Sequence, residues 1–110
     1  MSRDYLTDFE LMILLAILRV GEEAYGVPIA REMEQAGRRG VVLGAVYAAL
    51  GRVGANGLVT SSLGDPTPAR GGRAKRFFRV TPAGLKAVRQ MRQALTRLWD
   101  GIPQLEGGRS

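Results

Sequence analysis

The segment RGGRAKRFFRV, residues 70–80, places five positive charges in eleven positions and encloses two adjacent phenylalanines. In a β-strand, successive side chains point to opposite faces, so Phe78 and Val80 share one face while Phe77 and Arg79 share the other. We therefore expect Phe78 to pack inward and Phe77 to lie on the charged face, where guanidinium groups can stack on its ring. Like charges this close repel one another, which indicates a surface that meets a polyanion.

A second strand is predicted just before this segment. The stretch LVTSSL, residues 58–63, has strand character, and GDPTPARGG, residues 64–72, consists of turn-forming residues. Together with a strand over about 73–80, they predict a β-hairpin. Its nine-residue loop is longer than most hairpin loops, and long loops are often functional.

Three helices are predicted before the hairpin. Thr7 and Asp8 suit the start of a helix, and apolar residues follow at helical spacing. Pro28 suits the first position of a second helix over about 27–36. A third helix is predicted over about 43–56, because its apolar residues lie three or four positions apart despite two internal glycines.

A fourth helix follows the hairpin, with Thr81 as its N-cap and Pro82 as its first residue. Its apolar residues step alternately by three and four positions, as in a coiled-coil seam. Helices followed by a basic hairpin are typical of a winged helix-turn-helix, in which the third helix enters the major groove and the hairpin lies along the phosphates. The predicted fold is mainly α with a small β-hairpin: residues 1–81 form a winged helix-turn-helix DNA-binding domain, residues 82–103 a C-terminal dimerisation helix packed on the same domain, and residues 104–110 a flexible tail.

The composition narrows the possible functions. The 110 residues suffice for one domain, and the net charge is +6. Between positions 37 and 79 there are eight basic residues and only one acidic residue, and this imbalance favours a nucleic-acid partner. The alternative is a basic face that is simply solvated. Because Cys and His are absent, we expect no catalytic site, metal or cofactor. The longest apolar run, residues 11–18, is too short for a membrane span, so we expect a soluble cytoplasmic protein without a membrane partner.

Four stretches together carry a family resemblance. They are LTDFELMILLAI at 6–17, AYGVPIAREME at 24–34, GAVYAALGRVGANGLV at 44–59 and GGRAKRFFRVTPAGLKAV at 71–88. In these stretches the chain resembles the PadR family of bacterial transcriptional regulators. The resemblance implies a homodimeric winged-helix protein that binds an operator and usually represses, with one C-terminal helix used for dimerisation.

The resemblance also marks a departure in the third helix. The family's Gly-Thr-Leu-Tyr is here Gly44, Ala45, Val46 and Tyr47, so a hydroxyl is missing at Ala45 and the helix has few polar side chains. We expect the ring of Tyr25, an aromatic position in the family, to pack where the second helix begins.

Candidate DNA contacts come from the third helix, the basic residues before it and the hairpin. Arg52 is the one long side chain in the middle of the third helix that can donate hydrogen bonds to a guanine or a phosphate. Its alternative role is a surface salt bridge. Tyr47 could bond a phosphate or pack its ring against the first helices. Arg38 and Arg39 could touch phosphates or be merely solvated. The full set is Arg38, Arg39, Gly44, Ala45, Tyr47, Ala48, Arg52, Arg70, Arg73, Lys75 and Arg76.

The candidate dimer interface combines the first and fourth helices; its alternative is packing within one chain. The predicted residues are Leu11, Leu14, Leu18, Val88, Met91, Leu95, Leu98 and Trp99. Some short PadR-like regulators admit flat aromatic molecules between their subunits, so the resemblance makes Trp99 a candidate ligand contact for a planar aromatic effector. An ordinary interface anchor explains Trp99 equally well.

These observations favour a sequence-specific, DNA-binding regulator: a homodimeric repressor that a small-molecule effector releases from a double-stranded operator. The alternatives are a dimeric small-molecule-binding protein of the same fold with weak or non-specific DNA binding, and a non-specific chromatin protein. Equal affinity for all DNA sequences would distinguish the last of these.

Overall fold

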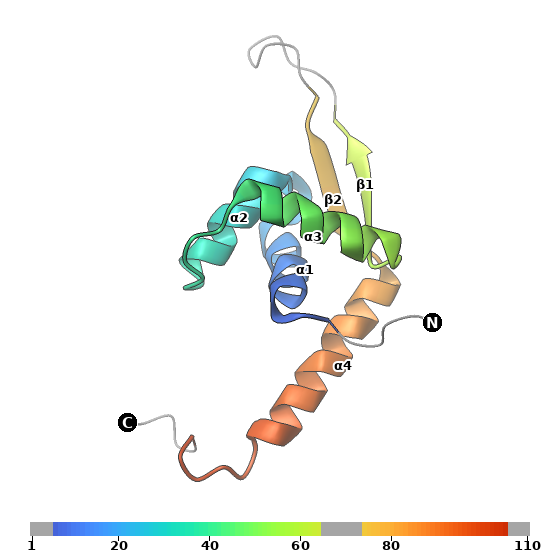
Figure 1. The fold of residues 1–110 in the computed structure, drawn as a ribbon. Coiled ribbons are helices and arrows are strands. Elements are labelled where there is room, and N and C mark those ends of the chain that lie inside the picture. The colour runs from blue at the N-terminus through green and yellow to red at the C-terminus, as the bar shows by residue number, and fades with distance from the viewer. Residues whose placement is uncertain (1–5, 65–73, 106–110) are drawn as a thin grey trace.

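The computed structural model describes residues 6–64 and 74–105, and Figure 1 shows their arrangement. The elements follow the predicted order: α1 (Asp8–Val20), the 3-10 turn η1 (Gly21–Glu23), α2 (Gly26–Gln35), α3 (Leu43–Ala55), β1 (Val59–Leu63), β2 (Arg76–Val80) and α4 (Pro82–Trp99). The predicted fold class, mainly α with a small hairpin, is confirmed.

Helix α1 begins with a reciprocal cap. The hydroxyl of Thr7 accepts the backbone N–H of Glu10, and the Glu10 carboxylate accepts the backbone N–H of Thr7, each at 3.1 Å. This arrangement satisfies two amides that the first turn of a helix leaves without partners. The cap fixes the position of Glu10, a residue that becomes important at the interface below.

The hydrophobic core lies where α1, α2 and α3 face one another. Each helix turns one apolar face inward, as helical spacing predicts. The largest fully buried apolar side chains are Ile13, Leu14, Ile29, Met33, Val46 and Val53. Since all three helices contribute to one core, α3 has a defined position with its opposite face on the outside.

The strands β1 and β2 are antiparallel, with Val59 opposite Val80 and Leu63 opposite Arg76. Phe78 packs against the core, and its backbone N–H donates to the carbonyl oxygen of Ala24 at 2.8 Å. The expected inward anchor is thus confirmed. Both strands start a little later than predicted, and the predicted loop from 65 onward, together with residue 73, lies outside the described residues.

Helix α4 is fixed to the body at its beginning. The Thr81 hydroxyl accepts the N–H of Gly84 at 3.0 Å and donates to the carbonyl of Gly57 at 2.7 Å. Gly84 is buried against the carbonyl of Leu58, where a β-carbon would collide. Beyond Met91, α4 runs away from the other helices (Figure 1), so most of its second half is exposed.

Two helix boundaries differ from the sequence-based expectation. Helix α2 begins at Gly26 after Tyr25, so Pro28 is its third residue rather than its first. Proline is tolerated throughout the first turn, because those amides have no partner within the helix. Helix α4 ends at Trp99, before the end predicted at 103. Among the described residues, no helix has both the length and the apolar character that crossing a membrane requires.

Candidate nucleic-acid interface

The outer face of α3 is built from small side chains. Gly44, Ala45 and Ala48 are exposed, because the buried positions of α3 lie on the side that faces the core. All three were predicted DNA contacts, and all three are accessible to a partner. A helix with such small outward residues allows close approach of its backbone to another surface.

Tyr47 connects α3 to the start of α2. The hydroxyl end of the Tyr47 ring lies so close to Gly26 that a β-carbon there would force the ring to move. The ring thus packs on α2 while the residue keeps 47% of its surface exposed. Packing on the first helices is confirmed, and a contact with a phosphate stays a prediction.

Arg52 forms an ion pair that joins α3 to α1. Its Nε lies 3.0 Å from Oε2 of Glu10, whose side chain is fully buried, while half of the Arg52 side chain is exposed. A buried carboxylate is costly unless a cation and hydrogen bonds compensate for its lost hydration. The salt-bridge role considered for Arg52 is therefore present, and the Nε–H of its guanidinium is used within the protein.

Arg38 is also held by α1. Its Nη1 lies 2.9 Å from Oδ2 of Asp8, and its guanidinium carbon lies 4.9 Å from the centre of the Phe9 ring. The hydrogen bond from Arg38 is the main cause that lowers the pKa of Asp8 below its usual 3.8. Arg39, next along the chain, is exposed. The two arginines before α3 thus have different surroundings.

An aromatic cluster fixes the hairpin to the start of α2. The rings of Tyr25 and Phe77 meet edge to face with their centres 5.7 Å apart, and the Lys75 ammonium lies 3.8 Å from the centre of the Tyr25 ring. The packing expected of Tyr25 is confirmed. The cation at this cluster is a lysine over Tyr25, where the sequence had suggested a guanidinium over Phe77. The cluster limits rotation of the hairpin relative to the helices.

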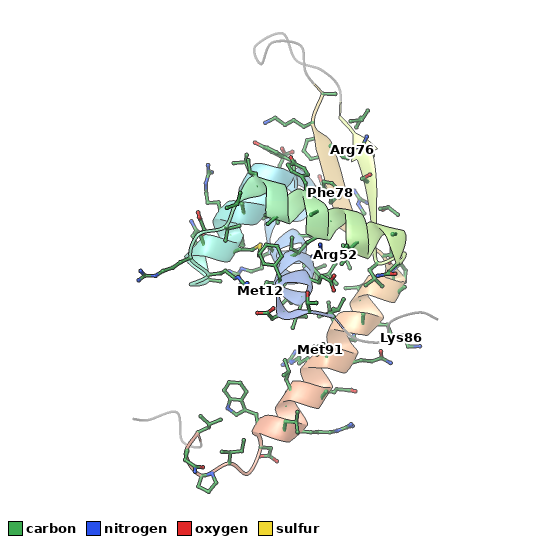
Figure 2. All side chains as sticks on the ribbon, viewed as in Figure 1. Met12, Arg52, Arg76, Phe78, Lys86 and Met91 are labelled. Carbon is green, nitrogen blue, oxygen red and sulfur yellow. The ribbon has the colours of Figure 1, made fainter. Side chains whose placement is uncertain are left out.

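Arg76 lies on the side of the hairpin that faces α3. A groove of about 360 Å³ separates the two elements, with Tyr47 and Gly51 on one wall and Arg76 and Phe78 on the other. Arg76 also donates to the Ser61 hydroxyl of the neighbouring strand at 3.0 Å. In Figure 2, Arg76 and Phe78 lie on the hairpin beside α3. Helix and hairpin therefore present one continuous surface.

The other hairpin arginines are placed differently. Arg79 lines a separate hollow with Leu18 and Glu22 near the end of α1, so it does not share the groove of Arg76. Arg70 and Arg73 lie outside the described residues. Within the described ranges, no group of three acidic side chains is arranged to hold a metal ion.

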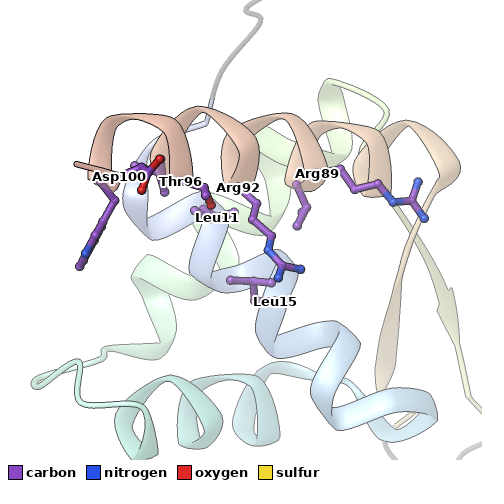
Figure 3. Close-up of a pocket in the computed structure, with 9 residues that line it drawn as sticks. Leu11, Leu15, Arg89, Arg92, Thr96 and Asp100 are labelled. Carbon is purple, nitrogen blue, oxygen red and sulfur yellow. The ribbon is translucent and has the colours of Figure 1, made fainter. Parts of the chain in front are cut away.

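A larger pocket lies between α1 and α4. It measures about 570 Å³, and Figure 3 shows Arg92 projecting from α4 toward Leu15 of α1. Its lining residues are Leu11, Leu15, Val88, Arg89, Arg92, Leu95, Thr96, Trp99 and Asp100. This pocket is mostly apolar and carries two guanidinium groups near its rim.

Four of the eight predicted dimer residues, Leu11, Val88, Leu95 and Trp99, line this pocket, and one of the eight needs correction. Leu18, Leu95, Leu98 and Trp99 are between 43% and 73% exposed, whereas Leu14 is fully buried in the core of its own chain and has no surface for a partner. Leu15 is 42% exposed, so the residue of α1 that faces outward at this point is Leu15 and not Leu14. Leu11, Val88 and Met91 are half-buried against the core.

A family match over most of the chain identifies the family of this protein. Residues 14–90 match the family described as Transcriptional regulator PadR-like family. The chain belongs to this family. Its fold, three helices with a hairpin and a fourth helix, is the winged helix-turn-helix of PadR-like regulators.

Solved structures support the assignment to the PadR-like family. A complex structure of hsRosR-S4 is 26% identical, with a TM-score of 0.68 over 90% of this chain and 78% of that one. A PadR-family regulator from Clostridium difficile R20291 is 22% identical, with a TM-score of 0.69 over 90% and 99%. A transcriptional regulator from Clostridium thermocellum is 21% identical, with a TM-score of 0.67 over 88% and 91%. A comparison with curated proteins found no match.

The sequence of this PadR-like chain does not reveal the ion pair between Glu10 and Arg52. The spacing of Thr7 and Glu10 is the signature of a capping box, but it does not reveal that Glu10 also binds Arg52. The two residues are 42 positions apart, and only the packing of α3 across α1 brings them together. Local sequence patterns carry no information about such a pair.

Proposed function

We propose that this PadR-like protein binds an operator in double-stranded DNA as a homodimer and represses transcription. Helix α3 would enter the major groove while the hairpin follows the phosphates, as in other winged helix-turn-helix proteins. The observation that supports this proposal best is the groove that α3 and the hairpin share, with Arg76 on its wall. A phosphate placed there would neutralise Arg76, the basic residue in the lining of this groove.

The basic residues divide into two groups under this proposal. Arg39 and Arg76 are exposed near α3 and are proposed phosphate contacts, together with Arg70 and Arg73, which lie outside the described residues. Arg38 and Arg52 pair with carboxylates and Lys75 lies over the Tyr25 ring, so these three would contact DNA only as a secondary role. Arg76, by contrast, donates to the uncharged hydroxyl of Ser61. We therefore assign most of the electrostatic affinity to the first group.

Dimerisation is supported by the exposed apolar residues of α1 and α4. Leu98 and Trp99 keep 73% and 60% of their surface exposed, and Leu18 keeps 44%. A second copy that covers these side chains would bury apolar area, at about 25 cal/mol per Å². It would also place two recognition helices on one operator, in half-sites about one helical turn apart.

A gel-shift experiment with DNA from beside the protein's own gene tests the proposal. We expect a specific complex that survives an excess of unrelated DNA. Arg76→Gln should reduce the slope of log K against log salt by about 0.9, the contribution of one phosphate contact. The matched control is Arg97→Gln near the end of α4, which should leave the slope unchanged. No complex with any fragment at low salt would refute DNA binding.

The pocket between α1 and α4 supports an effector site beside Trp99. Because Arg89 and Arg92 line it, we propose a flat aromatic guest that carries negative charge. Saturable quenching of Trp99 fluorescence by planar anionic dyes, accompanied by release of DNA, is the expected result. If the dyes quench Trp99 in a dimer that binds no DNA, the alternative function, a small-molecule-binding protein, is favoured. If no dye quenches Trp99, the proposed effector site is refuted.

A further inference from the structure

The outward face of α3 is apolar at the end that would enter the DNA first. Val42, just before the helix, is 64% exposed and Leu43 is 41% exposed. Ala45 and Ala48 follow on the exposed side of the next turn. Water-exposed apolar side chains at the N-terminal end of a recognition helix need an explanation, because this end usually contacts base edges.

Helix α3 carries two polar side chains, Tyr47 and Arg52, and each has a contact within the protein. Arg52, its sole charged residue, is held by the buried carboxylate of Glu10 at 3.0 Å. The Tyr47 hydroxyl end is packed against Gly26 of α2. This face therefore offers few side-chain groups for hydrogen bonds to guanine or adenine, and none at Val42, Leu43, Ala45 and Ala48.

The charges around the face indicate what covers it. Arg76 lines the groove beside α3, and Arg39 is exposed on the segment that leads into the helix. An apolar protein partner would have to leave these cations beside its own surface, whereas duplex DNA supplies phosphates for them. Charge complementarity thus assigns the face to the major groove rather than to another protein.

Only one base presents an apolar group in the major groove. Thymine carries a 5-methyl group there, and alanine and other apolar side chains contact it. We propose that α3 recognises the operator through thymine 5-methyl groups, packed against Ala45, Ala48 and the exposed Val42 and Leu43. This inference rests on the proposed DNA-binding function and adds the chemical feature that the protein reads.

Replacement of thymine by deoxyuridine tests the inference with the unaltered protein. A bound duplex is first selected from a random library, and each thymine is then replaced singly, which removes one methyl group and leaves base pairing intact. We expect about a fourfold loss of affinity at each thymine under α3, from the value of one buried methyl group. Thymines in the same duplex outside the protected region are the control and should show no loss.

A pair of variants links the effect to the helix. Ala48→Gly should reduce the difference between thymine and deoxyuridine, whereas Ala55→Gly, the same change at the far end of α3, should preserve it. Thermal melting of both variants checks that they are folded. A selected sequence bound equally well with thymine and deoxyuridine would overturn this inference and leave the proposed function intact. Selection of no sequence at all would overturn both.

Discussion

At the scale of single residues, two ion pairs connect α1 with α3 and with the segment just before α3. Glu10 binds Arg52 of α3, and Asp8 binds Arg38 just before α3. The first pair involves a fully buried carboxylate, so it is strongly constrained; the second is near the surface and contributes less. Both pairs keep their arginines on the protein and thereby set the direction of α3.

Arg52→Met should destabilise the fold, because it removes a charged partner of the buried Glu10 carboxylate. Removing one partner of such a pair costs about 2 kcal/mol, allowing for the half-exposed arginine. Urea denaturation measures the free energy of unfolding. The double variant Glu10→Leu, Arg52→Met should recover part of the loss, and an Arg52→Met protein as stable as the original would show that the pair contributes nothing.

Asp8→Asn should change the pH dependence of stability. The pKa of Asp8 is lowered in the folded protein, chiefly by the hydrogen bond from Arg38, so its stabilising contribution is present above the ordinary value of 3.8 and is lost as the pH falls below it. We expect a lower Tm for the variant at pH 7 and a difference that shrinks as the pH falls below 3.8. In an Arg38→Gln background the difference at pH 7 should shrink; an undiminished difference would exclude Arg38 as its cause.

At the scale of elements, close contacts fix how the pieces meet. Gly84 lets α4 lie directly against the backbone of Leu58, and Thr81 ties the same junction to Gly57. By contrast, Gly51 lies on the exposed part of α3 with open space where a β-carbon would be. Packing within the chain therefore explains the glycine at position 84 of α4, but it does not explain the glycine at position 51 of α3.

Replacement of these two glycines by alanine should have opposite effects on stability. Gly51→Ala should raise the free energy of unfolding by about 1 kcal/mol, because alanine is the better helix former. Gly84→Ala should lower it by about 2 kcal/mol, because the methyl group collides with the Leu58 carbonyl and Val80. Urea titration of both variants provides the comparison, and two changes of the same sign would contradict this account of the junction.

At the scale of the whole molecule, the apolar side chains of the α1–α3 core are buried, whereas those at the end of α4 are exposed. The three-helix core buries its large apolar side chains, while the second half of α4 extends from the body with Leu95, Leu98 and Trp99 exposed. An extended apolar helix is stabilised when a second surface covers it. The molecule thus supports a dimer built on α1 and α4, with the DNA surface elsewhere.

If the proposed dimer forms through α4, Leu98→Glu should convert it into a monomer, because a charged group would have to be buried at the interface. The fold of the chain should persist, since 73% of the Leu98 surface is exposed. Analytical ultracentrifugation measures the mass in solution. Gln93→Glu on the same helix is the control and should stay dimeric; a dimeric Leu98→Glu protein would place the interface elsewhere.

The sequence by itself determined the elements and their order, because helix caps, apolar spacing and turn residues act over a few positions. It determined the inward direction of Phe78 from strand alternation, and family membership followed from motifs spread along the chain. Only the tertiary structure decided that Arg52 binds Glu10, that Lys75 covers Tyr25, and that Leu14 is buried while Leu15 is exposed. These outcomes depend on how whole elements pack against one another, which brings together residues far apart in the chain, and local spacing does not encode that packing.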